Sequence, residues 1–125
     1  PVSSPRYALM KYEPISEMTI TECEAALVRN EPDELLLAAI SVGLYCDDLE
    51  WAQGYLLTLS AHPHEAVRGS AILSFGHLAR RFRSLDSSRV KSIVVCALSD
   101  SSEFVRGQAD SAADDLELFL KWSMA

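Results

Sequence analysis

The chain has 125 residues, 49% of them hydrophobic, and 11 Lys and Arg against 18 Asp and Glu give a formal net charge of −7. This length is that of one ordinary domain, and the hydrophobic share is too high for a disordered chain. The negative charge argues against generic nucleic-acid binding and against docking on an anionic membrane, because both require clustered Lys and Arg.

In chain order, residues 1–15 are expected to form an N-terminal arm that contains three prolines. Residues 16–125 are predicted to form a single all-α domain, because apolar residues recur at helical spacing and no segment alternates with the period of a strand. Start signals include a possible capping box at Thr19 and Glu22, a proline at position 32 and an N-cap at Asp86. The predicted helices cover about 19–29, 32–45, 48–60, 65–83, 86–98 and 102–122.

Two segments of the chain repeat each other at an offset of 38 residues, so that Val67 matches Val105 and Arg68 matches Arg106. Each unit is predicted to be a helix, a short turn and a second helix. A third, degenerate copy precedes them, in which the Glu-Pro-Asp-Glu of residues 31–34 matches the His-Pro-His-Glu of residues 62–65. Further matches at the same offset are Glu65 with Glu103, Gly69 with Gly107, Ala71 with Ala109 and Leu78 with Leu116.

The segments Leu-Ser-Ala-His-Pro-His-Glu-Ala-Val-Arg-Gly-Ser-Ala (59–71) and Leu-Ser-Asp-Ser-Ser-Glu-Phe-Val-Arg-Gly-Gln-Ala (98–109) resemble HEAT repeats. In that family an Asp in the turn and an Arg six residues later form a ladder of hydrogen bonds between neighbouring repeats. Asp100 and Arg106 match this pattern, whereas the earlier copy keeps Arg68 but has His62 in place of the Asp. The resemblance implies a short α-solenoid of about three helical hairpins, over about 19–45, 48–83 and 86–122, with Arg68, Asp100 and Arg106 as the structural inter-repeat ladder.

The last predicted helix carries carboxylates where the preceding repeat carries a contact strip. Gly69, Ile72, Gly76 and Ala79 form a small, apolar strip that allows the next helix to approach closely. The equivalent strip of the last helix is acidic, and two interpretations stay open: a solvated cap on the terminal repeat, or a surface for a basic partner. Trp122 lies beyond the repeat and is expected to be an exposed anchor. The predicted partner-binding residues are Glu103, Asp110, Asp114, Asp115, Glu117 and Trp122.

No catalytic, metal-binding or cofactor-binding motif is evident. His62, His64 and His77 lack the spacing of a metal site, and no phosphate-binding glycine loop or nucleophile motif is present. We therefore expect no enzyme activity, no metal and no cofactor. The basic residues between positions 80 and 91 are interpreted as helix-end charges and inter-repeat ion pairs rather than as a nucleic-acid patch.

The three cysteines, Cys23, Cys46 and Cys96, fall within apolar helical patterns and are expected to be reduced core thiols. The sequence also opens without a signal-peptide pattern, so we expect a cytoplasmic protein.

Small size, net acidity and the acidic end favour a protein-binding module with a basic partner. Its most specific form is an acidic bacterial immunity protein that neutralises a cognate toxin, such as a nuclease, an assignment that rests partly on how small HEAT-like proteins are used. Two alternatives remain. One is a scaffold or regulatory subunit with mainly hydrophobic contacts, and the other is a protein that resembles the HEAT-like phycobilin lyases. Neither nucleic acid nor a membrane is expected as a partner.

Overall fold

The computed structural model describes residues 15–124, so that the predicted N-terminal arm lies outside the described residues except for its last position. Within this range the chain is all-α, as predicted from the sequence, and it contains no strand. The ends of the helices fall within about three residues of their predicted positions. The helices are α2 (Ile20–Arg29), α3 (Pro32–Tyr45), α4 (Leu49–Leu59), α5 (Glu65–Phe82), α6 (Ser87–Ala97) and α7 (Glu103–Leu120).

Short polar side chains start most of these helices. The predicted capping box is confirmed: Thr19 Oγ1 accepts from the Glu22 N–H at 3.1 Å, and Glu22 Oε1 accepts from the Thr19 N–H at 2.8 Å. Pro32 occupies the first turn of α3, where its missing N–H costs nothing. Asp86 caps α6 by accepting from the Ser88 N–H at 3.1 Å, and Ser102 caps α7. These local signals explain why the helix starts can be predicted from the sequence.

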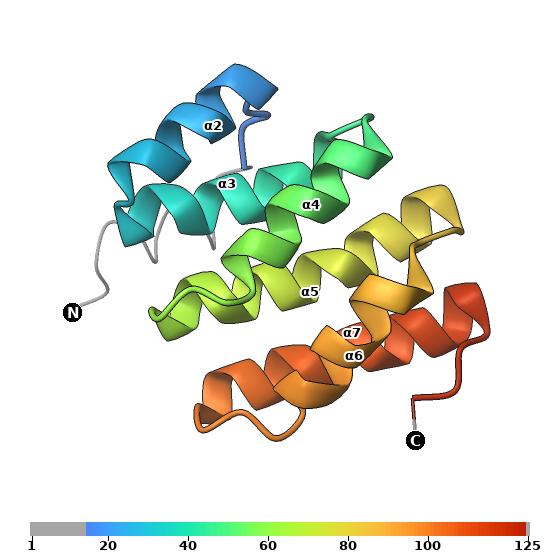
Figure 1. Ribbon diagram of the computed structural model, residues 1–125. Helices are drawn as coiled ribbons and strands as arrows, with labels where there is room; N and C mark the ends of the chain where they lie inside the picture. Colours follow the sequence, from blue (N-terminus) through green and yellow to red (C-terminus); the bar gives the residue numbers. More distant parts are fainter. Residues whose placement is uncertain (1–14, 125) are drawn as a thin grey trace.

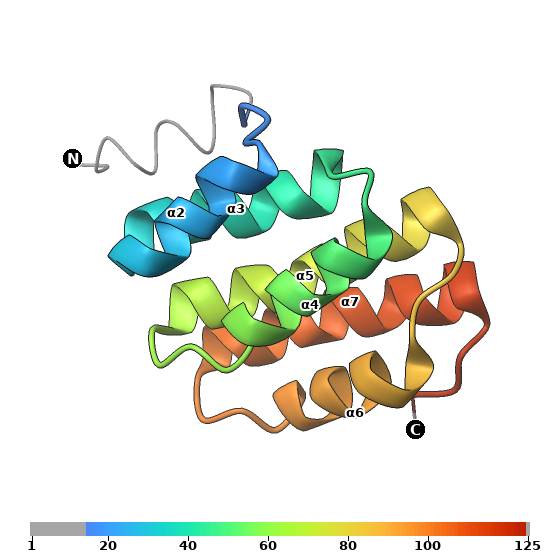
Figure 2. The same ribbon diagram turned by 45° about the horizontal axis from the view of Figure 1, so that its top comes forward.

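The helices form two layers (Figures 1 and 2). The second helices of the successive pairs, α3, α5 and α7, lie side by side in one layer, with α5 in the middle. The first helices of the pairs, α2, α4 and α6, form the other layer. Among the described elements, α7 packs against α5 and α6 and therefore lies at one end of the stack. Its remaining face has no helical neighbour among residues 15–124.

Close approach of the second helices depends on residues without a bulky side chain. A Cβ atom added to Gly43 of α3 would lie 2.7 Å from the Cβ of Ser74, whose hydroxyl donates to the Ala39 carbonyl at 2.9 Å. In the next contact, Gly69 and Gly76 of α5 face α7. The predicted contact strip of α5, namely Gly69, Ile72, Gly76 and Ala79, is buried throughout. The prediction that this strip seats the following helix is thus confirmed.

A continuous apolar core fills the space between the two layers. Phe75 of α5 is its largest fully buried side chain, with none of its surface exposed. Leu56 and Leu59 from α4 and Val90 and Val94 from α6 belong to the same buried cluster, so both layers contribute. Burial of this cluster is the main source of stability for a helical stack of this size.

Arg81 ties the end of α3 to α5. Its guanidinium donates to the carbonyl oxygens of Gly43 and Cys46, both at 2.9 Å, and to Asp47 Oδ1 at 3.2 Å. Arg89 pairs with Asp86 and Glu50, the latter on α4. These contacts satisfy carbonyls that a helix end leaves free, and they confirm ion pairing for two of the basic residues between positions 80 and 91.

The cysteines are not all core thiols. Cys23 is fully buried, and this burial raises its pKa to about 11. Cys46 is half-buried at the C-cap of α3, and Cys96 is exposed on α6. The prediction is therefore wrong for Cys96. The short helix α6 buries the face that carries Val94 and Ala97, and Cys96 lies at about 200° from Val94 around the helix axis.

Candidate functional site

The candidate site lies on the outer face of α7, the end helix of the stack (Figure 1). One side of this helix is buried in the core through Val105, Ala109 and Leu116. A second side packs on α5, where the ring of Phe104 and the side chain of Gln108 cover Gly69. The third side faces away from both neighbours. Among residues 15–124, no other helix covers that side.

This outer side carries four exposed carboxylates, Glu103, Asp110, Asp114 and Glu117, which we call the acidic ridge. Their spacings of seven, four and three residues place them on one face of the helix. Within residues 15–124, none of the four takes part in a hydrogen bond or ion pair. Within the described chain the four ridge carboxylates are therefore exposed and without an ion pair, as the repeat pattern predicts.

Carboxylates elsewhere in the described chain contrast with the ridge. Asp100 pairs with Arg68, Glu34 with Arg29 and Glu50 with Arg89. Most of the other acidic groups thus have a cation or an N-cap as partner, whereas the four ridge carboxylates share one face of α7 without such a partner.

Asp115 differs from the ridge although it was predicted with it. Its side chain is half-buried and faces Gly76 of α5, whose added Cβ would lie 2.5 Å from Asp115 Oδ2. It also lies near His77. Burial, together with Arg80 and Arg81, lowers the pKa of His77, and the charge of Asp115 offsets part of this lowering. Asp115 is therefore a contact between α5 and α7 rather than part of the exposed ridge.

Trp122 is not the exposed anchor expected from the sequence. Its side chain is half-buried and packs against the core, next to the buried Met124. Lys121 ends α7 in the left-handed region, with φ of 61°, and this turn directs Trp122 back so that its N–H donates to the Leu116 carbonyl at 3.4 Å. The exposed large apolar side chains of α7 are instead Phe104 at 42% and Leu118 at 60%. A helical-wheel projection of α7 places both beside the ridge, a signal that was present in the sequence.

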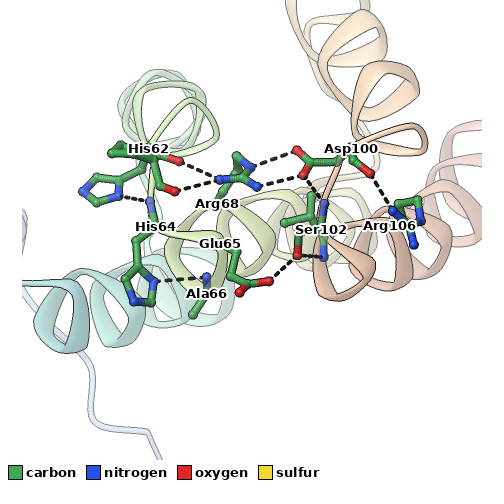
Figure 3. A network of polar contacts seen from close by, with 10 residues as sticks. His62, His64, Glu65, Ala66, Arg68, Asp100, Ser102 and Arg106 are labelled. Carbon is green, nitrogen blue, oxygen red and sulfur yellow. Dashed lines mark hydrogen bonds and ion pairs between the residues drawn. The ribbon is translucent and has the colours of Figure 1, made fainter.

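A polar network joins the two turns that precede α5 and α7 (Figure 3). The guanidinium of Arg68 donates to both carboxylate oxygens of Asp100, at 2.9 and 2.7 Å, and to the carbonyls of His62 and Pro63 at 3.1 Å. Arg106 reaches the same turn by donating to the Asp100 carbonyl at 2.8 Å. The residues predicted as an inter-repeat ladder, Arg68, Asp100 and Arg106, are thus brought together at the junction of the last two helix pairs.

An open pocket of about 650 Å³ lies over this junction, between the starts of α5 and α7. Glu65 lines it and accepts a hydrogen bond from the Ser102 hydroxyl, while Glu103 connects the pocket to the acidic ridge. The charge of Arg68 in its wall is already compensated by Asp100. Glu103 is therefore shared by the pocket at the polar junction and by the acidic ridge.

His62 and His64, in the turn that precedes α5, accept hydrogen bonds from nearby backbone N–H groups. His62 Nδ1 accepts from the His64 N–H at 3.0 Å, and His64 Nδ1 accepts from the Ala66 N–H at 3.2 Å at the start of α5. Burial, together with His64 and Arg68, lowers the pKa of His62. Among the described residues, no group of three or more His, Cys, Asp and Glu side chains is arranged to hold a metal ion. A search of the same residues finds no helix long and apolar enough to cross a membrane.

No protein-family model matches the sequence, and the search of curated proteins finds no match. Among solved structures, this chain is similar to a chain in the "Crystal structure of CDI complex from Cupriavidus taiwanensis LMG 19424". The two share 28% sequence identity and a TM-score of 0.76, over 88% of this chain and 97% of that chain. The likeness covers nearly the whole of both chains and so concerns the entire fold.

Breaking the Arg68–Asp100 pair is expected to destabilise the junction without unfolding the protein. The Asp100→Asn substitution should lower the free energy of unfolding by about 1–2 kcal/mol, since the lost bonds are charge-assisted but partly reached by solvent. Arg68 and the Ser102 N–H hold the pKa of Asp100 below its ordinary value of 3.8. The stabilisation is therefore complete above pH 3.8 and is lost as the pH falls through the lowered pKa.

Urea unfolding at neutral pH and near pH 3 measures this effect. The difference between the native chain and the Asp100→Asn variant should shrink at the lower pH. Glu34→Gln serves as the matched control, because its partner Arg29 is mostly exposed. An equal effect of both substitutions at neutral pH would contradict a specific role for the junction.

Proposed function

We propose that this chain is an immunity protein that binds and neutralises a cognate toxin. The observation that carries the proposal is the whole-chain likeness to a component of a CDI complex, where CDI stands for contact-dependent inhibition, a toxin–immunity system. At 28% identity and a TM-score of 0.76, the likeness includes sequence as well as backbone.

The acidic ridge supports the inhibitor's role within such a pair. A toxin that acts on nucleic acid has a positive cleft for phosphates, and an acidic inhibitor is steered toward that cleft. Four unpaired carboxylates on one face of α7 supply this complementary charge. The proposed partner is therefore a basic toxin domain, such as a nuclease, and the proposed site of action is the cytoplasm. In this proposal the chain has no enzyme activity of its own.

We further propose that the three described helix pairs are HEAT-like repeats of a short α-solenoid. The side-by-side packing of α3, α5 and α7 supports this interpretation, as does the Arg68–Asp100 contact between successive pairs. In such a stack each repeat contacts only its neighbours, so the last helix has both a polar cap and a free binding surface.

The direct test starts from the gene directly upstream: where it encodes a large secreted protein, the C-terminal domain of that protein is tested for association with this chain. We expect a stable complex whose association rate falls by about tenfold or more when the salt concentration rises from 0.05 to 0.5 M. Surface plasmon resonance over this range measures the rate, and a toxicity assay checks neutralisation. Absence of a complex would contradict the proposal. A complex whose association is independent of salt would show that mainly hydrophobic contacts, rather than the charge of the acidic ridge, drive the binding.

A further inference from the structure

The contact between α5 and α7 shows how this fold seats a large side chain on a helix. The ring of Phe104 lies directly over Gly69, where an added Cβ would come within 2.6 Å of Cε2 and 2.8 Å of Cδ2. Any side chain larger than hydrogen at this position would displace the ring. Gly69 is thus the position on α5 against which an aromatic side chain of α7 packs, and we call such a position a seat.

Gly107 occupies the equivalent position one repeat later, 38 residues along the chain. It is exposed on the outer face of α7, and nothing lies within 4 Å of where its Cβ would be. Glycine in the interior of a helix is destabilising relative to alanine. Packing within the described chain does not require glycine here, and the seat that Gly107 forms is open.

Two carboxylates border this open seat on the side away from α5. Asp110 and Asp114, three and seven residues after Gly107, lie on the same face of α7, and neither has an ion-pair partner among the described residues. Phe104 borders the seat on the α5 side and is 42% exposed. A side chain that entered the seat would therefore contact glycine backbone and an aromatic ring, with carboxylates at its edge.

We propose that Gly107 receives a large apolar or aromatic side chain from a helix of the toxin partner, whose flanking Lys or Arg residues pair with Asp110 and Asp114. This inference rests on the proposed function. The partner helix lies against α7 as α7 lies against α5, and its anchor residue repeats the contact that Phe104 makes with Gly69. A buried apolar or aromatic anchor inside a polar rim is the usual composition of a protein interface.

Filling the seat is the test, because the space around Gly107 allows the change without disturbing the fold. Gly107→Leu should weaken binding of the toxin domain at least tenfold, mainly through faster dissociation. Its helical circular dichroism should be unchanged, and its thermal midpoint should be equal or higher. Gly107→Ala should show a smaller loss of affinity. Gly54→Leu on α4 is the matched control, since nothing lies within 4 Å of a Cβ there either, and it should bind as the native chain does.

The outcomes separate this inference from the proposed function. If the native chain binds the toxin domain and Gly107→Leu binds equally well, the seat is not used and only the inference fails. An equal loss of affinity in Gly54→Leu would also overturn it. Failure of the native chain to bind any toxin domain would overturn both proposals. A native dimer that Gly107→Leu dissociates would assign the seat to a second copy of the chain and refute a toxin anchor.

Discussion

Replacing Asp110, Asp114 and Glu117 by Lys is expected to reduce the affinity for a basic toxin domain at least a hundredfold. Each substitution changes the charge by two units, so three of them raise the net charge from −7 to −1 and turn attraction at the ridge into repulsion. All three side chains are exposed and make no ion pair within the described residues, so the fold should remain intact. Surface plasmon resonance measures the affinity, and far-ultraviolet circular dichroism checks the helix content.

A control with the same net charge separates the ridge from a general charge effect. Lys substitutions at Glu24, Glu31 and Glu50 also raise the net charge from −7 to −1, but these exposed side chains lie on or beside α2 and α4. Their contacts with Trp51 and Arg89 are exposed and contribute little to stability. The control should keep its affinity within about threefold in physiological salt. Comparable losses in both triple variants, or native affinity of the ridge variant, would refute the ridge as the binding surface.

Phe75→Ala is expected to cost about 3–5 kcal/mol of unfolding free energy. The Phe75 ring is fully buried in the core of the described chain, at the centre of the stack. Removing it deletes apolar contacts and leaves a cavity that rigid helices on both sides cannot fill. Urea unfolding followed by circular dichroism at 222 nm measures the loss.

Phe119→Ala is the matched control for this prediction. Phe119 also packs against the core, but it is only half-buried, and the guanidinium of Arg83 lies over its ring at 4.8 Å from the centroid. Its removal should cost clearly less than that of Phe75, because solvent can occupy part of the space. A smaller effect for Phe75 than for Phe119 would contradict the position of the core between the two layers.

Helix positions were predictable because their signals are local. A capping residue, a proline or a stop lies within a few positions of the backbone groups that it satisfies, as Thr19 and Pro32 show. The contact strip of α5 was also predictable, since residues three and four apart share a face. The same spacing identified Glu103, Asp110, Asp114 and Glu117 as one face of α7.

Asp115 and Trp122 show where such reasoning fails. Asp115 follows Asp114 directly, yet a step of about 100° around the helix turns it toward Gly76 of α5. Trp122 lies outside the repeat pattern, and its burial depends on the left-handed turn at Lys121. The exposure of Cys96 likewise depends on which face of α6 the neighbouring helices cover.

By itself, the sequence determined the all-α class, the helix ends and the repeat of 38 residues, because propensity, capping and periodicity act over a few residues of chain. Only the tertiary structure decided which acidic groups are free. Arg68 compensates Asp100 across 32 residues of chain, whereas the ridge carboxylates on α7 make no ion pair within the described residues. The physical reason is that ion pairing and burial depend on neighbours in space, which helical spacing within one segment cannot specify. For the same reason, the sequence alone does not identify the open position at Gly107. That position is recognised from the packing of the Phe104 ring over Gly69.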